Sequence, residues 1–512
     1  MTTNNQTLSQ WKGLVAKYPK VEFIWLELLW YTSNTFVRMV PRAKFAAMIE
    51  SDTYFNVPLV AFYLTPGDHP AKGASPSGSF RLCPDLSTAY CQAGSGGTRL
   101  VIQCECTQPD GSPLDLCARS RLRTLDNTLQ CKMGMDILIG FEIEVVFMKP
   151  EKSPDGAPTY SPLSSLHSWS SVTRDDLMYL DLIESIARSL ADVGIMLEHF
   201  HSEAAPGQWE FVLPPESPVK AIDSLLKARE TIRSVACSGG LHATLYPRVI
   251  DDEIGTGAHV HISVNNRNGY TQSPDGFFGG IIQHMPSILA FTLPQEVSYQ
   301  RVQTGLFSGG EYACWGWENK EASLRRIDMN RFEFKLMDGL ANPYLALSAI
   351  LAAGLDGLEK ETPLLGGPCD QAYAHLRPEE QKALGITTML PKTLKDSLAA
   401  LEANSELGVL LGPGMVSAYA MILNLQALKS WCSKITPRAH SMCHLRTAIY
   451  IDTRFYLLLK SFMNVRNLDV QRRKGDMLLV LAILQPSLYQ NLLLKLNLIT
   501  QKYLKAVKRT TW

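Results

Sequence analysis

The sequence predicts an α/β protein of the α+β kind, in which a largely antiparallel sheet is flanked by helices. Segments that alternate apolar and polar residues, as strands do, are mixed irregularly with longer segments of helical period. Parallel sheets would instead require a regular strand–helix alternation. The chain has 512 residues, 46% of them hydrophobic, which is enough for more than one domain with a large core.

The first part of the chain predicts a small sheet. Residues 21–64 alternate in polarity and are rich in aromatic and β-branched residues. A loop rich in glycine, proline and serine follows at residues 65–80, and TRLVIQCEC then predicts another strand. We place a boundary near residue 110, so that the first predicted domain spans residues 15–110.

Residues 111–422 predict a second, larger domain. Helical patterns occur near residues 117–133 and in RDDLMYLDLIESIARSLADVG, AIDSLLKARETIRSVACSGG and NPYLALSAILAAGLDGLEK, and LKDSLAALEANSEL predicts a late helix. Strand patterns occur in DILIGFEIEVVFM, GQWEFVLPP, residues 258–264 and RFEFKLMD. Because strands and helices do not alternate one by one, an antiparallel sheet is favoured.

The last ninety residues, 423–512, differ in composition from the rest. They contain 15 Lys and Arg residues but only three aspartates, and no glutamate follows Glu406. One interpretation is an artefact of the gene model, such as intron read-through or a frameshift, which the abrupt loss of glutamate favours. The other is a real basic appendage that binds an acidic partner or a membrane surface.

Composition excludes several classes of protein. Lys+Arg and Asp+Glu both number 49, so net charge does not indicate a nucleic-acid partner, and we expect none. The N-terminus lacks the pattern of a secretory signal, and the longest apolar runs are far shorter than the roughly 20 residues of a membrane span. The 11 cysteines form no CxxC pair. We therefore predict a cytoplasmic protein with reduced thiols and no membrane span.

The segment GTGAHVHISV, residues 255–264, places three polar side chains on one side of a strand. His259, His261 and Ser263 alternate with apolar residues, and alternate residues of a strand share a face. Taken alone, a His-x-His pair is as often a surface pair as a metal ligand.

Three further segments carry charged residues with the same spacing. They are GFEIEVVF with Glu142 and Glu144, SEAAPGQWEFVL with Glu203 and Glu210, and RFEFK with Arg331, Glu333 and Lys335. Each alone is more often a solvated face of a sheet. If the strands join one sheet, however, five carboxylates and a histidine converge, which is strongly destabilising without cations. Oxygen ligands without thiolates favour Mg²⁺ or Mn²⁺, and two such ions could clamp a phosphoryl group.

In their order along the chain, GFEIEVVF, EAAPGQWEF, HATLYP, GTGAHVHISV, NKEASLR and RFEFKLMDGLANPYLALSAILAAG resemble the motifs of glutamine synthetases. SYQRVQTGLFSGGEYACWGWENKE resembles the fungal glutamine-synthetase-like proteins, whose larger members carry an amidohydrolase half that we do not expect here. The resemblance covers roughly residues 20–422. It implies a small N-terminal β-grasp domain, a catalytic domain, and a homo-oligomer, expected to be a double-ring dodecamer with active sites between subunits.

The resemblance also implies an activity and a role for each matching residue. The family reaction uses ATP to phosphorylate the side chain of glutamate, and an amine then displaces the phosphate, with two Mg²⁺ or Mn²⁺ ions bound. One ion would be held by Glu144, Glu203 and Glu210 and the other by Glu142, His259 and Glu333; His261, Ser263, Arg325 and Arg331 would bind ATP; Arg301, Lys320 and Lys335 would be catalytic; and Gly255 with Arg301 would bind the amino acid.

The likeness departs from the family where the amine would bind. Phe307 stands where the synthetases carry a loop glutamate, and Trp30 where they carry an aspartate, and both acids serve ammonium. Aromatic side chains at these positions favour a larger or more apolar amine, although Trp30 could instead belong to the core of the small sheet. Lys335 replaces an arginine, which keeps the charge but loses the bidentate fork. Ile254 occupies a position that is often asparagine.

Two functions are therefore compatible with the sequence. The first is an ATP-dependent ligase of glutamate with ammonia or a larger amine, which the complete set of metal-ligand types favours. The second is a catalytically impaired ring protein that binds nucleotide and metal in a regulatory or scaffold role, which the missing amine-site acids favour.

Overall fold

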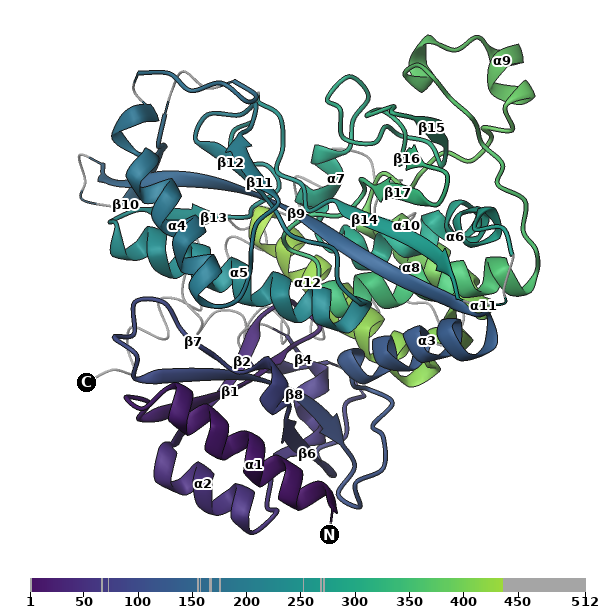
Figure 1. Ribbon diagram of the computed structural model, residues 1–512. Coiled ribbons are helices and arrows are strands. Elements are labelled where there is room, and N and C mark those ends of the chain that lie inside the picture. Colours follow the sequence, from purple (N-terminus) through teal and green to yellow (C-terminus); the bar gives the residue numbers. More distant parts are fainter. Residues whose placement is uncertain are drawn as a thin grey trace, which may run out of the picture. The chain divides into compact units, whose positions relative to one another are not determined.

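The computed structural model describes residues 2–435, apart from residues 66–67, 72, 154–155, 157, 165–167, 175, 252, 268 and 270–271 (Figure 1). The first 431 residues form one compact unit. The domain boundary near residue 110 falls inside this unit and stays a prediction. Most of the basic segment 423–512 lies outside the described residues. Both interpretations of this segment therefore stay predictions.

A mixed sheet of six strands is built from the first part of the chain, as predicted. Its order is β2-β1-β8-β6-β3, with β7 also paired to β8, and only β1 and β8 run parallel. A separate two-stranded sheet is formed by β4 and β5, which come between β3 and β6 in the sequence. The strands are β1 (Phe23–Leu29), β2 (Thr35–Pro41), β3 (Phe55–Pro58), β4 (Leu64–Thr65), β5 (His69–Pro70), β6 (Ser79–Pro84), β7 (Tyr90–Cys91) and β8 (Arg99–Thr107).

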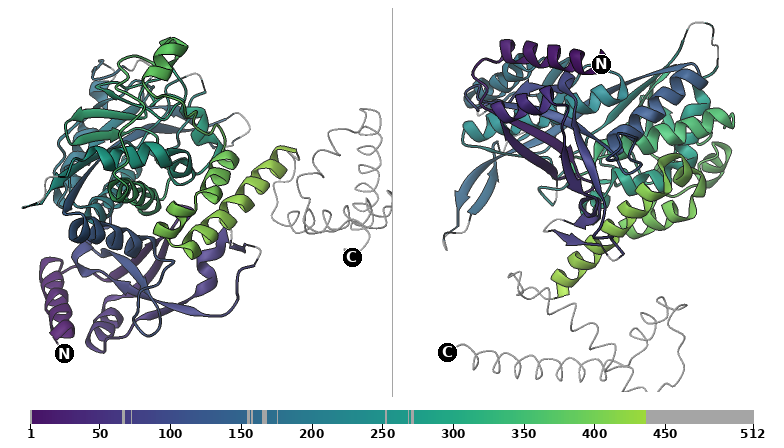
Figure 2. Two further views of the ribbon diagram at one scale, coloured as in Figure 1. Left: turned by 90° about the vertical axis from the view of Figure 1, so that its right-hand side faces the viewer. Right: turned by 90° about the horizontal axis from the view of Figure 1, so that it is seen from below.

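Two helices in this part were not predicted. They are α1 (Thr2–Lys17), which lies on the outer side of the small sheet in all views, and α2 (Arg42–Glu50) (Figures 1 and 2). The alternating pattern of residues 21–64 hid α2, which begins directly after Pro41 and buries only Phe45, Met48 and Ile49. Two 3₁₀ turns, Leu59–Tyr63 and Leu86–Thr88, complete this region.

The second sheet has nine strands and is antiparallel except for one pair, which confirms the predicted architecture. Its order is β11-β12-β9-β14-β17-β16-β15, and β10 and β13 also pair with the long strand β9. Only β15 and β16 run parallel. The strands are β9 (Met135–Lys152), β10 (Pro158–Pro162), β11 (His199–Ser202), β12 (Gln208–Val212), β13 (His242–Thr244), β14 (Val260–Asn266), β15 (Trp315–Trp317), β16 (Leu324–Asp328) and β17 (Arg331–Phe334).

Helices α3, α5 and α8 lie along one side of this sheet (Figure 1). α8 begins where the sequence predicts it, because the Asn342 side chain accepts hydrogen bonds from two backbone N–H groups of the first turn and Pro343 follows. The predicted late helix is two helices, since Asn404 ends one and caps the next. The helices are α3 (Ala118–Lys132), α4 (Leu180–Asp192), α5 (Pro218–Ser238), α6 (Asp275–Thr292), α7 (Glu296–Arg301), α8 (Pro343–Glu359), α9 (Pro378–Ala383), α10 (Leu394–Ala403), α11 (Ser405–Leu411) and α12 (Pro413–Ile435).

Strand β9 shows how the core positions the site. Phe141 and Ile143 are fully buried in the hydrophobic core, so Glu142 and Glu144 point to the opposite face of the sheet. Among the described residues, no single helix meets the length and hydropathy of a membrane span; α11 with the first part of α12 does so only as a sharply bent pair.

Candidate active site

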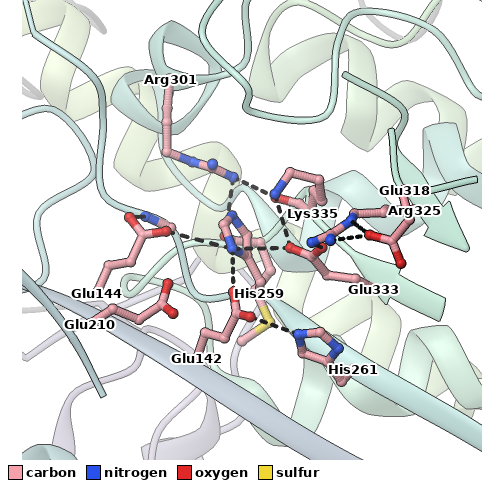
Figure 3. A network of polar contacts seen from close by, with 12 residues as sticks. Glu142, Glu144, Glu210, His259, His261, Arg301, Glu318, Arg325, Glu333 and Lys335 are labelled. Atoms are coloured by element: carbon pink, nitrogen blue, oxygen red, sulfur yellow. Dashed lines mark hydrogen bonds and ion pairs between the residues drawn. The ribbon is translucent and has the colours of Figure 1, made fainter. Parts of the chain in front are cut away.

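Charged side chains from neighbouring strands of the large sheet form one row (Figure 3). Glu210 on β12 lies opposite Glu144 on β9. Farther along the sheet, His261 on β14 lies opposite Glu333 on β17, which in turn lies opposite Arg325 on β16. The register of the antiparallel pairs therefore brings together residues far apart in the sequence, such as Glu144 and Glu333, which are 189 positions apart.

His259 is at the centre of this row, just before β14. Its Nδ1 atom lies 2.8 Å from Glu142 Oε2, 3.3 Å from Glu333 Oε1 and 3.5 Å from Glu144 Oε1. The second histidine, His261, places Nε2 2.7 Å from Glu142 Oε1. Glu142 thus lies between the two imidazoles that the sequence places on one face.

Two carboxylates of the site are well compensated by nearby cations. Burial opposes ionisation of Glu333, yet Lys335 and His259 hold its pKa at about 2. The Lys335 ammonium donates to Glu333 Oε1 at 2.9 Å. Burial also opposes ionisation of Glu142, but hydrogen bonds from His259 and His261 lower its pKa well below the usual range.

Two other carboxylates lack such compensation. Burial, together with the neighbouring Glu144 and Glu210, raises the pKa of Glu203 to about 7. The pKa of Glu210 is also raised, chiefly by burial, although His201 opposes the shift. The His201 imidazole has its pKa raised to about 9, mainly by its hydrogen bond with Glu210. This end of the row holds more negative charge than the chain itself neutralises.

The predicted metal ligands fit divalent cations. Two groups of three ligand atoms, one from each residue, lie within 4.8 Å of one another: Glu142, Glu210 and His259, and Glu142, His261 and Glu333. Carboxylate oxygens with imidazole nitrogens suit Mg²⁺ or Mn²⁺, and the raised pKa values of Glu203 and Glu210 indicate that ionising both carboxyl groups is costly until a cation binds. The assignment of each residue to one of two ions stays a prediction.

The predicted nucleotide-binding cations lie at the other end of the row. Arg325 Nη1 is 3.1 Å from Glu333 Oε2, and Arg331 Nη2 is 3.3 Å from His261 Nδ1. Ser263 follows on β14, where its hydroxyl contacts Asn265. Lys320 is not drawn into the row; its ammonium lies over the ring of Trp169, 4.9 Å from the centroid.

Arg301 and Gly255, the predicted amino-acid-binding pair, are in direct contact. A Cβ atom at Gly255 would lie 2.5 Å from Arg301 Cγ, so only glycine allows this approach. The Arg301 guanidinium is buried and donates through Nη2 to the carbonyls of Lys335 and Met337 at 2.9 and 3.1 Å. Its buried Nε has no hydrogen-bond partner among the described residues. The side chain is thus held in place while its Nε donor stays available to a ligand.

The two aromatic residues at the predicted amine site are in different surroundings. Phe307 is 59% exposed on the loop after α7 and has a positive φ of 54°. Its N–H group donates to Glu321 Oε1 at 2.6 Å. Trp30, in contrast, follows β1 and packs edge-on against Phe36 of the small sheet and Phe62 of the 3₁₀ turn Leu59–Tyr63. Within one chain, Trp30 therefore belongs to the packing of that sheet and not to the row of charged residues.

Several residues of the site were not predicted. Gln208 donates to Glu144 Oε2 at 2.8 Å and to the Gly255 carbonyl at 3.3 Å, linking the metal side to the amino-acid side. Glu318 accepts a hydrogen bond from Arg325 Nε at 3.0 Å. His201 could have been found, because HFH at residues 199–201 repeats the spacing of HVH.

Comparison with known proteins agrees with this geometry. Residues 115–439 match the family described as glutamine synthetase, catalytic domain. The chain belongs to the glutamine synthetase family. This confirms the resemblance seen in the motifs, and the match extends past the predicted boundary at residue 422.

Two curated relatives within this wider group are similar over much of the chain. Protein fluG of Emericella nidulans is 38% identical over 436 residues, which are 84% of this chain and 50% of fluG. The gamma-glutamylpolyamine synthetase GlnA3 of Streptomyces coelicolor is 31% identical over 367 residues, which are 67% of this chain and 76% of GlnA3. The chain thus spans half the length of fluG.

A solved structure shows the same glutamine synthetase fold. The GmaS/ADP complex superposes with a TM-score of 0.69 at 24% identity and covers 85% of this chain and 98% of GmaS. A structure described as a novel glutamine synthase homolog gives a TM-score of 0.65 at 23% identity, covering 80% of this chain and 94% of the homolog. Both likenesses support the fold class predicted from the sequence.

Proposed function

We propose that this chain is an ATP-dependent ligase of the glutamine synthetase type that forms γ-glutamyl phosphate and transfers the γ-glutamyl group to an amine, either ammonia or a larger amine. The observation that carries the proposal is the convergence of Glu142, Glu144, Glu210, His259 and Glu333 in one row across the sheet. Such a row is costly unless cations bind to it.

Two bound Mg²⁺ or Mn²⁺ ions would supply positive charge for phosphoryl transfer. The chain's own residues would orient the reactants. Arg325 and Lys335 already contact Glu333 at the end of the row where ATP is expected, and positive charge there stabilises a transferring phosphoryl group. Arg301, buried and fixed by two carbonyls, would bind the carboxylate of glutamate. Lys320, which lies over Trp169, would have to move to act.

A larger amine is favoured over ammonia by the surroundings of the Phe307 loop. The side chain is exposed and apolar where a carboxylate would attract ammonium, and an aromatic ring can hold an organic cation by cation–π contact. The name of the relative GlnA3, a gamma-glutamylpolyamine synthetase, is consistent with this choice.

The alternative is a nucleotide- and metal-binding ring protein with a regulatory or scaffold role. This alternative is favoured because the two predicted amine positions carry Trp30 and Phe307 and therefore no acid, and because Trp30 packs within the small sheet. Both functions share a proposed homo-oligomer, a double-ring dodecamer with sites between subunits in the cytoplasm, which light scattering and electron microscopy of the purified protein would test.

Phosphate release from ATP with Mg²⁺ and glutamate, scanned against ammonia, hydroxylamine and larger amines including polyamines, tests the proposal. We expect release stimulated by at least one amine, and loss of at least a hundredfold in Glu333→Gln. The matched control is Glu359→Gln, at the end of α8. Phe307→Glu should shift the preference toward ammonia. Tight Mg²⁺-dependent ATP binding without release under any condition would favour the ring protein instead.

A further inference from the structure

A second His-x-His segment lies at the edge of the large sheet. His199 and His201 are on β11, the outermost strand in the sheet order, while Phe200 between them stacks on Phe211 of β12. Both imidazoles therefore share the other face, where their ring centroids are 5.7 Å apart and their planes 17° apart. Glu210 lies directly opposite His201 on β12. Two imidazoles and a carboxylate thus meet at an accessible edge.

The donor atoms of these three residues are arranged for one ion. One ligand atom from each of His199, His201 and Glu210 lies within 4.8 Å of the others, and His201 Nε2 is 3.3 Å from Glu210 Oε1. The other ring nitrogen of His201, Nδ1, is 3.1 Å from the Ser202 carbonyl. An N–H group at Nδ1 that donates to this carbonyl orients the ring, as in many metal-binding histidines, so that Nε2 faces Glu210. A metal ion bound there would replace the proton that Nε2 shares with Glu210.

Only one side chain must move to complete the geometry. Ligands about 2.1 Å from a tetrahedral ion are about 3.4 Å from one another, and the pair of His201 and Glu210 already meets this distance. His199 is exposed on an edge strand, so a change of rotamer can bring its imidazole closer.

We propose that His199, His201 and Glu210 form a binding site for a borderline transition-metal ion such as Zn²⁺, Co²⁺ or Ni²⁺, with a fourth position open to water. Two nitrogen donors and one oxygen favour such ions over Mg²⁺, which prefers an octahedron of oxygens. The site differs from the central row in its two histidines, because neither His199 nor His201 belongs to the ligand set implied by the family, whereas Glu210 is common to both.

The two kinds of metal site share one residue, which links their occupancies. Glu210 is also a predicted ligand in the central row, so an ion bound at His199 and His201 would remove part of the negative charge that would hold Mg²⁺ there. Transition-metal ions should therefore weaken Mg²⁺ binding and inhibit turnover. This consequence rests on the proposed function, whereas the binding of the ion does not.

The binding is tested with Co²⁺ on the full chain in saturating Mg²⁺, followed by the visible absorption of tetrahedral Co²⁺ and its displacement by Zn²⁺. We expect His199→Gln to weaken Co²⁺ binding at least tenfold, a typical minimum for loss of a metal-site residue. The matched control is His242→Gln, another exposed histidine on the same sheet, which should bind as the unaltered chain does. Equal Co²⁺ binding by His199→Gln and the unaltered chain, as cysteine thiolates would give, overturns the site.

Inhibition by Zn²⁺ of the amine-stimulated phosphate release tests the linkage. The inhibitory Zn²⁺ concentration should rise at least tenfold in His199→Gln and stay the same in His242→Gln. Binding that depends on His199 without any inhibition would establish the site and disprove the linkage. If the unaltered chain shows no phosphate release at all, the proposed ligase fails, and the cobalt titration still decides the site.

Discussion

Two groups of partly buried carboxylates in this chain differ in what neutralises them. Around Arg119 on α3, the carboxylates of Asp85, Glu105 and Asp223 lie 2.6 to 2.7 Å from a single guanidinium. In the candidate active site, the pKa of Glu203 is instead raised to about 7 by burial and by other glutamates. The first group is completed by the chain itself, and the second is completed only by a bound cation.

The difference teaches how similar residues serve stability in one place and binding in another. Glu105 belongs to the small sheet and Asp223 to α5, so Arg119 ties these elements together. Burial works against its charge, but the hydrogen bonds with Asp223 and Asp85 raise the pKa of Arg119. The active-site row stores uncompensated negative charge, which lowers stability until cations arrive.

The largest effect is expected at Arg119. Arg119→Met takes the buried guanidinium away from three carboxylates, of which Glu105 and Asp85 keep Arg123 as a second cation. The main loss is therefore the pair of Arg119 with Asp223, and breaking a buried ion pair in this way costs about 3–5 kcal/mol. Thermal and urea unfolding of the purified protein would measure the loss. Arg188→Met, which breaks an exposed pair with Glu184 on α4, is the matched control and should cost less than about 1 kcal/mol. Equal losses in the two variants would show that the Arg119 group does not hold the elements together.

A buried carboxylate outside both groups is Glu27 on β1, which has no ion pair and belongs to no cluster of possible metal ligands among the described residues. Its partner is Gln103, which donates to Oε2 at 2.9 Å, and burial raises the pKa of Glu27 to about 7. The unfolded chain gives up this proton near pH 4.5, the ordinary value. Between that pH and 7 the folded state therefore binds more protons than the unfolded state, so Glu27 makes the protein less stable as pH rises.

Glu27→Gln should remove this penalty. Raising the pKa of Glu27 from 4.5 to about 7 corresponds to at most about 3.4 kcal/mol. The variant should gain up to that amount over the unaltered chain at pH 8 and almost nothing at pH 4, measured by unfolding at both values. Glu22→Gln, at the start of the same segment, should show no such pH dependence. A gain that is equal at pH 4 and pH 8 would mean that Glu27→Gln stabilises the protein through packing and not by removing an ionisable carboxyl group.

The sequence was sufficient for those features that depend on local pattern. Alternation correctly placed Glu142 with Glu144 and His259 with His261, because a strand face is set by residue parity. It could not show which strands pair, and so it missed Gln208, whose contacts cross from β12 to β9 and to the Gly255 carbonyl.

Positions set by loops or by long-range packing were beyond the sequence. Lys320 was assigned to the phosphate side, yet its ammonium lies over Trp169, a contact between segments about 150 residues apart. Glu321 was not noticed, because its role in holding the Phe307 loop depends on a positive φ that no residue pattern revealed. α2 was missed because a short helix with three buried side chains gives little periodic signal.

The smallest effect is expected at Glu203, where the comparison between the two groups becomes a direct measurement. Glu203→Gln removes one uncompensated charge, so the metal-free protein should be about 1 kcal/mol more stable, within the usual range for one buried polar group. Ions that bind only the folded state raise stability by about 2.7 kcal/mol at a hundred times Kd. Mn²⁺ should therefore raise the melting temperature of the unaltered chain more than that of Glu203→Gln. Glu198→Gln, exposed nearby, should respond as the unaltered chain does. Two results together would contradict this prediction: Mn²⁺ raises the melting temperature of Glu203→Gln and of the unaltered chain equally, and the metal-free variant is no more stable. Glu203 would then be neutralised by the chain itself, like the carboxylates around Arg119.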